Sequence, residues 1–66
     1  DNMLKNTVKV TFNDNKVKTF RNVKKVDTDI NYSMYQLVHK DNGETYLFRK
    51  DIQSIYFGKN VKVEVF

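Results

Sequence analysis

The chain contains few side chains that could catalyse a reaction. His39 is its only histidine, Ser33 and Ser54 are its only serines, and it has no cysteine. Nucleophilic catalysis needs a nucleophile, a base and a group that orients the base. Because His39 shares one face of an expected strand with Tyr35 and Leu37, we interpret it as a packed or surface-edge histidine. The sequence therefore predicts no catalytic site and no enzymatic activity.

Two acidic patterns resemble fragments of metal or acid–base sites. Asp27 and Asp29 alternate along an expected strand, which would place their carboxylates on one side, about 7 Å apart. Residues 41–44 (DNGE) resemble part of a calcium loop but lack the distal glutamate. We interpret the aspartates as turn formers and residues 41–44 as a hairpin turn. With no cysteine and only two glycines, the chain is expected to bind no metal and no cofactor.

The basic side chains are concentrated in the first part of the chain. Residues 1–26 carry seven basic and two acidic side chains, whereas residues 27–66 carry five and six. Small barrels bind single-stranded nucleic acid with a basic groove and aromatic stacking platforms. The candidate binding surface combines both kinds of side chain: Lys16, Lys18, Arg21, Lys24, Lys25, Tyr46 and Tyr56.

The elements that carry these residues are expected to be strands, because hydropathy alternates with a period of two. Strands are predicted near residues 7–12, 16–21, 24–30, 32–39, 45–49, 52–57 and 61–66, separated by turn residues at 13–15, 41–44 and 58–60. Two segments leave alternatives open. Val23 and Val26 also fit one helical turn, and Ile52 to Phe57 fit either a short strand or a turn that leads into one. Residues 32–39 are apolar on both faces, which indicates a central strand.

The chain is predicted to form one small all-β domain over residues 1–66. Valine, phenylalanine and tyrosine favour strands, and alanine, the best helix former, is absent. We expect an antiparallel meander of six or seven short strands that forms an SH3-like or Sm-like barrel, with a two-layer β-sandwich as the alternative. No run of about 18 apolar residues indicates a membrane-spanning helix. Met3 is a candidate natural start.

The sequence also contains a weak internal repeat. A shift of 28 positions superimposes Val10, Phe20 and Arg21 on residues of the same type, and it brings Val23 and Val26 close to Ile52 and Ile55. This predicts two similar halves. The two ends, residues 8–10 and 61–63, are both Val-Lys-Val. If they pair, the sheet closes; if they do not, residues 61–66 form an edge that could pair with another chain.

The residue stretches 13–26 and 41–57 (DNGETYLFRKDIQSIYF) resemble small all-β proteins encoded by phages and mobile elements of AT-rich Gram-positive bacteria. In those proteins a turn, a strand that ends in Phe, a short connector and a Val/Ile pair follow in the same order. The resemblance implies a structural class, mostly without assigned activity, and the cytoplasm of a bacterial host. It implies no functional residue.

Two functions remain for a chain of this kind. A domain of 66 residues cannot bury all nine aromatic side chains, and exposed tyrosines are good interface anchors. The first hypothesis is therefore a non-catalytic module that binds a protein partner, such as a host factor or an assembly component, or that self-associates through residues 61–66. The alternative is a nucleic-acid-binding barrel that uses the basic surface.

Overall fold

The computed structural model describes residues 5–66, so the candidate start Met3 lies outside the described residues. The described part contains seven strands: β1 (Val8–Phe12), β2 (Val17–Phe20), β3 (Val23–Thr28), β4 (Met34–His39), β5 (Glu44–Phe48), β6 (Ile52–Phe57) and β7 (Lys62–Val65). A single 3₁₀ turn, Arg49–Asp51, joins β5 to β6. No helix in residues 5–66 has the length and apolar character needed to cross a membrane.

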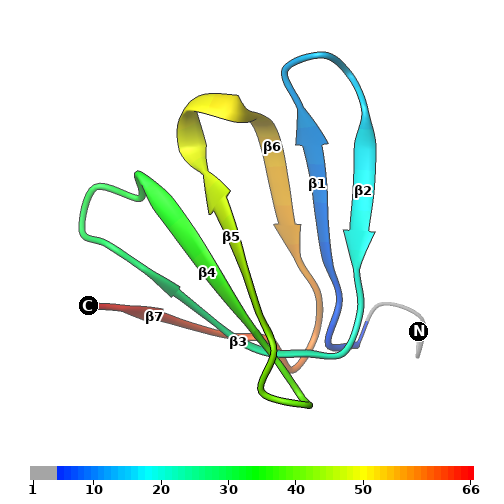
Figure 1. The fold of residues 1–66 in the computed structure, drawn as a ribbon, viewed down its shortest axis with the longest axis vertical. Helices are drawn as coiled ribbons and strands as arrows, with labels where there is room; N and C mark the ends of the chain where they lie inside the picture. Colours follow the sequence, from blue (N-terminus) through cyan, green and yellow to red (C-terminus); the bar gives the residue numbers. More distant parts are fainter. Residues whose placement is uncertain (1–4) are drawn as a thin grey trace.

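The strands form two sheets (Figure 1). Sheet A has the order β2-β1-β6, and sheet B has the order β5-β4-β3-β7. The all-β class with seven short strands is confirmed, and β4 is a central strand as expected. The two sheets do not close into a barrel, so the described chain corresponds to the two-layer alternative.

The two ends of the chain, whose pairing the sequence left open, do not pair with each other. β1 pairs with β2 and β6, both antiparallel, whereas β7 pairs with β3 in parallel. The strand order is therefore not that of a simple antiparallel meander. β7 is an edge strand of sheet B, which is the second outcome that the sequence left open.

The hydrophobic core lies between the sheets and is built from side chains of β1, β3, β4, β5 and β6. Eight hydrophobic side chains are buried there: Val8, Val10, Val23, Val26, Tyr35, Leu37, Leu47 and Ile52. Phe57 packs against this cluster, and its ring centroid lies 6.0 Å from that of Tyr35. Burial of aliphatic side chains contributes about 1.5–3 kcal/mol each, so this cluster is the main source of stability.

Two β-bulges explain a spacing that the sequence left ambiguous. Val23 pairs with His39 and Lys25 pairs with Val38, so Lys24 has no partner across the strand pair. An unpaired residue shifts the alternation by one, and Val23 and Val26 can then both point into the core although they are three positions apart. β6 has the same irregularity between Ile52 and Ser54. The helical-turn alternative for Val23 and Val26 is thus wrong.

The predicted repeat is present in the backbone as two halves, β1–β2–β3 and β4–β5–β6. Adding 27 to the residue numbers of the pairs in hairpin β1–β2 gives the pairs of hairpin β4–β5. For example, the pair Val10↔Lys18 corresponds to the pair Leu37↔Thr45. The third strands, β3 and β6, correspond after a shift of 29, because the second half has two additional residues before β6. The residue equivalent to Phe20 is therefore Leu47, and not Phe48 as the sequence shift of 28 suggested.

Each half contributes its third strand to the other half's hairpin. β3 pairs with β4, and β6 pairs with β1. β1 and β4 are therefore both central strands, and each has one neighbour from its own half and one from the other half. Neither sheet consists of one half alone.

The same turn closes both hairpins. Asn15 N–H donates to Phe12 O and Asn42 N–H donates to His39 O, each at 2.9 Å. Asn15 and Asn42 have φ angles of 69° and 70°, a left-handed conformation that asparagine tolerates better than most residues. The side chains of Asp14 and Asp41 each accept a hydrogen bond from the backbone N–H of the residue two positions further along the chain. Gly43, the glycine that follows Asn42, does not have a positive φ.

Candidate functional site

The outer face of sheet B carries a row of apolar and aromatic side chains. Met34 pairs with Phe48, Gln36 with Tyr46, and Val38 with Glu44. Directly paired residues share a face of the sheet, and the intervening Tyr35, Leu37 and Leu47 point into the core. We call the group Met34, Gln36, Val38, Tyr46 and Phe48 the outer strip.

The two aromatic residues of the outer strip are the most accessible. Tyr46 is 52% exposed and Phe48 is 49% exposed. Met34, Gln36 and Val38 are half-buried beside them. Single exposed apolar residues are common on protein surfaces, but adjacent ones on one sheet face mark an interaction surface more often.

Hydrogen bonds hold the phenol of Tyr46. Gln36 Nε2 donates to Tyr46 Oη at 3.3 Å, and Tyr46 Oη donates to Glu44 Oε1 at 3.1 Å. The hydrogen bond to Glu44 and the negative charge of that residue raise the pKa of Tyr46. The ring is therefore neutral and oriented, and a binding partner would meet a fixed apolar face with a polar end.

Lys25 lies on the same outer face of sheet B, on β3. Its Nζ is 3.5 Å from Asp27 Oδ2 and 3.4 Å from Glu64 Oε1. The charges of Asp27 and then Glu64 raise the pKa of Lys25. Two carboxylates thus compensate this lysine, which makes it a poor contact for a phosphate group. These are the two ion pairs found within residues 5–66.

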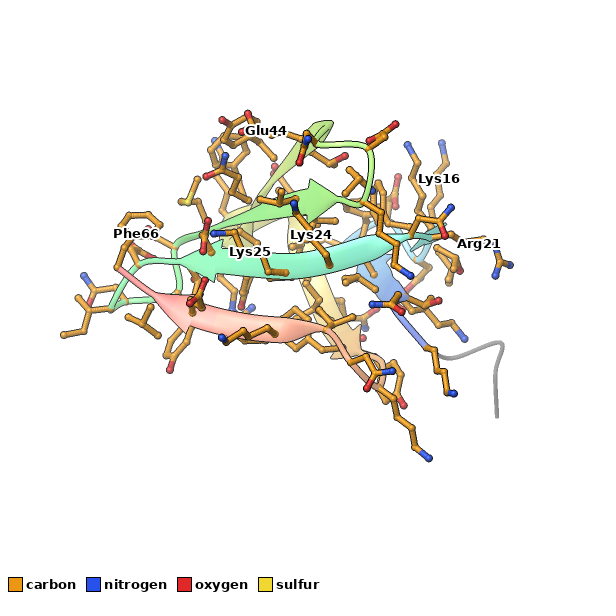
Figure 2. The ribbon with its side chains drawn as sticks, turned by 90° about the horizontal axis from the view of Figure 1, so that it is seen from below. Lys16, Arg21, Lys24, Lys25, Glu44 and Phe66 are labelled. Carbon is orange, nitrogen blue, oxygen red and sulfur yellow. The ribbon has the colours of Figure 1, made fainter. Side chains whose placement is uncertain are left out.

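The structure places the predicted surface residues in three separate regions. Lys16, Lys18 and Arg21 lie along β2, at the edge of sheet A. Lys24 and Lys25 lie on β3, and Lys24 Nζ donates to Asn42 Oδ1 at 2.9 Å. In Figure 2, Lys16 and Arg21 are at the end of the molecule opposite Phe66, with Lys24 and Lys25 between them.

The two predicted tyrosines lie on different sheets. Tyr46 belongs to the outer face of sheet B. Tyr56 pairs with Lys9 and points to the outer face of sheet A, where it lines a shallow depression with Lys9, Thr11 and Ser54. The structure therefore does not bring the basic residues and both tyrosines together in one groove.

The edge of sheet A along β2 is distinctly basic. β1, β2 and β6 contain no acidic residue. Among residues 5–66, no carboxylate lies within ion-pair distance of Lys16, Lys18 or Arg21. Lys18 Nζ lies 5.2 Å from the ring centroid of Phe20, a cation–π contact on this edge.

His39 and the two aspartates have structural contacts. His39 Nδ1 is 3.2 Å from Arg21 O, and Nε2 is 2.8 Å from Thr45 Oγ1, so the ring bridges β5 and the chain that leads into β3. His39 pairs with Val23 and Asp27 pairs with Gln36, at different positions along the sheet. Asp29 accepts hydrogen bonds from the backbone N–H (2.6 Å) and the hydroxyl of Ser33. Within residues 5–66, no three His, Cys, Asp or Glu side chains form a metal-binding group.

No known protein family, curated protein or solved structure matches the chain. The resemblance to proteins of phages and mobile elements stays a prediction.

Of the five residues of the outer strip, only Tyr46 belongs to the candidate binding surface that the sequence predicted. That surface does not include Met34, Gln36, Val38 and Phe48. Met34 and Val38 did give a signal, because residues 32–39 are apolar on both faces. That pattern indicated a central strand and did not by itself indicate an exposed apolar face. In the structure, sheet A covers one face of β4, and the other face forms the outer strip.

Proposed function

We propose that this chain is a non-catalytic binding module that contacts a protein partner through the outer strip. The supporting observation is that Tyr46 and Phe48, each about half exposed, lie side by side with Met34 on the sheet face that does not contribute to the core. Aromatic side chains contribute a large share of the binding energy at protein interfaces.

The charges around the outer strip indicate what kind of surface would fit it. Lys25 is compensated by Asp27 and Glu64, and Glu44 lies at the end of β5. Lys25, which pairs with Val38 of the strip, is therefore not an uncompensated cation that would favour a polyanion. A complementary surface is apolar opposite Phe48 and Met34, and it offers a hydrogen-bonding group to the hydroxyl of Tyr46 or the amide of Gln36.

A pair of matched variants tests the proposal. Tyr46→Ser with Phe48→Ser removes both aromatic rings from the outer strip, whereas Tyr56→Ser removes an equally exposed ring from sheet A. Immobilised wild type and both variants are used to capture proteins from a lysate of a low-GC Gram-positive bacterium, and the captured protein is then purified for calorimetric titration. We expect the outer-strip variant to lose about 30-fold or more in affinity and the Tyr56→Ser variant to bind like wild type.

The salt dependence of the titration adds a second criterion. Binding through the outer strip should change little between about 50 and 200 mM salt, because few counterions are released. Equal affinity of the three proteins, or a steep loss with salt, would contradict the proposal. Melting curves establish that both variants are folded.

Nucleic-acid binding is the second candidate, and the basic edge along β2 favours it. Lys16, Lys18 and Arg21 have no acidic partner among the described residues, and Phe20 offers one ring beside them. If this edge binds nucleic acid, the affinity for a fluorescent single-stranded oligonucleotide should fall steeply between about 50 and 200 mM salt. Lys16→Glu with Lys18→Glu should abolish that binding, whereas Phe48→Ser should not affect it.

A further inference from the structure

β7 is an edge strand that is open on one side. It pairs with β3 through Lys25↔Lys62 to Thr28↔Val65, and within residues 5–66 no strand pairs with its other side. All four of its residues are exposed. Figure 2 shows β7 as the outermost strand beside β3, and it ends near Phe66.

The hydrogen bond of Phe66 shows which backbone groups of β7 remain unpaired. Phe66 N–H donates to Thr28 O at 2.9 Å. The backbone N–H and C=O groups of successive residues in a strand point to opposite sides. The backbone groups of Lys62 and Glu64 therefore point toward β3, as the N–H of Phe66 does. The N–H and C=O groups of Val63 and Val65 therefore point away from β3, toward the open side, where they offer a template for another strand.

We propose that two copies of this chain associate by antiparallel pairing of their β7 strands, with the two-fold axis at Val63. In this register Val63 lies opposite Val63 of the second copy, and Lys62 lies opposite its Glu64. The unpaired groups of Val63 face those of the second copy's Val63. Val65 N–H faces the C=O of the second copy's Val61, whose N–H already donates to Gly58 O at 3.4 Å. These groups can form the ladder of an eight-stranded sheet.

The charges of β7 select this register. A two-fold axis at Lys62 would place two lysines directly opposite each other, and an axis at Glu64 would place two glutamates opposite each other. Like charges at directly opposed positions destabilise a sheet, whereas opposite charges stabilise it. Only the axis at Val63 gives two Lys62–Glu64 pairs.

The apolar face of β7 agrees with the same arrangement. Val63 and Val65 pair with Val26 and Thr28, so their side chains lie on the core side of sheet B. They are nevertheless 43% and 53% exposed, because no strand lies beyond them. In the proposed dimer they form a continuous row with Val61 and with the valines of the second copy.

The edge strand that carries a lysine in sheet A lacks this complementarity. β2 contains Lys18, follows Lys16 and has no acidic residue. Any antiparallel pairing of two β2 strands would therefore bring lysines together without a compensating charge. Lysines on an edge strand are a common protection against such pairing.

The proposed contact is small. Four-residue strands that meet edge to edge bury less than the roughly 1,200–2,000 Å² of a stable protein interface. We therefore expect a reversible dimer whose population rises with concentration over about 10 μM to 1 mM in sedimentation measurements.

Charge exchange at residues 62 and 64 tests the register. Lys62→Glu places glutamates opposite Glu64, and Glu64→Lys places lysines opposite Lys62, so each variant alone should lose dimerisation by about 10-fold or more. An equimolar mixture of the two variants should regain it, because a chain with two glutamates then faces a chain with two lysines. This recovery also shows that β7 is still folded in both variants, although Glu64→Lys removes the ion pair with Lys25.

A crosslink provides an independent measurement, since the chain has no native cysteine. Val63→Cys places two sulfurs across the two-fold axis at a Cα separation of about 5.5 Å, within reach of a disulfide. Val65→Cys is the matched control, because its two copies lie four residue positions apart, about 13 Å. We expect rapid crosslinking at 63 and none at 65.

Three results would overturn the inference: a wild type that is monomeric at about 1 mM, single variants that dimerise like wild type, or a mixture that does not recover. Equal crosslinking at 63 and 65 would overturn the register. None of these measurements involves the outer strip, so they are independent of the proposed binding function.

Discussion

Tyr46 in β5 and Thr19 in β2 occupy equivalent positions in the two halves of the chain, yet they face different surroundings. Tyr46 pairs with Gln36 in the outer strip, whereas Thr19 pairs with Lys9. The first half carries most of the unpaired lysines, and the second half carries most of the exposed aromatic rings. Phe48, the other aromatic residue of the outer strip, ends β5 and corresponds by the same shift of 27 to Arg21, which lies just beyond the end of β2.

This difference shows which residues determine the backbone and which determine the surface. The inward side chains and the two Asp-Asn turns are alike in both halves, and they position the strands. The outward positions differ, and they separate the basic edge of sheet A from the aromatic face of sheet B. A single-strand-binding groove needs basic and aromatic side chains on one surface, and here the largest groups of each lie on different sheets.

The largest effect is expected from the two equivalent core positions, Val10 and Leu37, which are both fully buried. Leu37→Ala should lower the free energy of unfolding by about 2–5 kcal/mol, because it leaves a cavity between the sheets. Val10→Ala removes a smaller side chain and should cost about 1.5–3 kcal/mol. Because each sheet contains strands from both halves, both variants should unfold in one transition, monitored by circular dichroism and tyrosine fluorescence. Two separate transitions would show that the halves are independent.

The two hairpin turns should be equally sensitive to substitution of Asn15 or Asn42 by alanine. Alanine tolerates the left-handed conformation less well than asparagine, so Asn15→Ala and Asn42→Ala should each lower the free energy of unfolding by about 1 kcal/mol. Replacement by glycine should restore most of that loss, since glycine has no Cβ to clash. Chemical denaturation of the four variants gives the comparison. If one turn tolerates alanine and the other does not, the two hairpins are not equivalent.

A contribution that is lost in acid is expected from Asp29, in the loop between β3 and β4. The hydroxyl of Ser33 donates to Asp29 and lowers the pKa of that carboxyl below its ordinary 3.8. A carboxyl whose pKa is lowered in the folded state stabilises the fold above its unfolded pKa, and this contribution is lost as the pH falls through the folded value. Asp29→Asn should therefore flatten the loss of stability below pH 3.8, measured as the midpoint of denaturation against pH. If the midpoint of denaturation of the variant falls with acid as steeply as that of the wild type, Asp29 is not the source of the acid sensitivity.

The smallest effect should come from the ion pairs of Lys25. Surface ion pairs contribute about 0–1 kcal/mol, so Lys25→Gln should destabilise the chain only slightly, and less at high salt. Ser54 is the equivalent residue of the second half and lies in neither ion pair, so Ser54→Ala is the matched control. A loss that is large and independent of salt would mean that Lys25 acts through packing of its aliphatic stem.

The sequence was sufficient for the elements that depend on neighbouring residues. Alternation in β1 and β7 and the clusters Asn13–Asn15 and Asp41–Gly43 placed the strands and turns close to their observed positions. Properties that depend on distant residues were not predictable. The bulges at Lys24 and Gln53, the parallel pairing of β7 with β3, and the opposite locations of Tyr46 and Tyr56 follow from which strands meet in three dimensions.

The exchange of third strands has a consequence for synthesis of the chain. β1 leaves the ribosome before its second neighbour, β6, which ends at Phe57. Until those residues emerge, Val8 and Val10 lack the strand that completes their sheet, and the open side of β1 is available to other nascent chains. Folding of sheet A must therefore await translation of β6, and termination before Ile52 would release a product prone to aggregate.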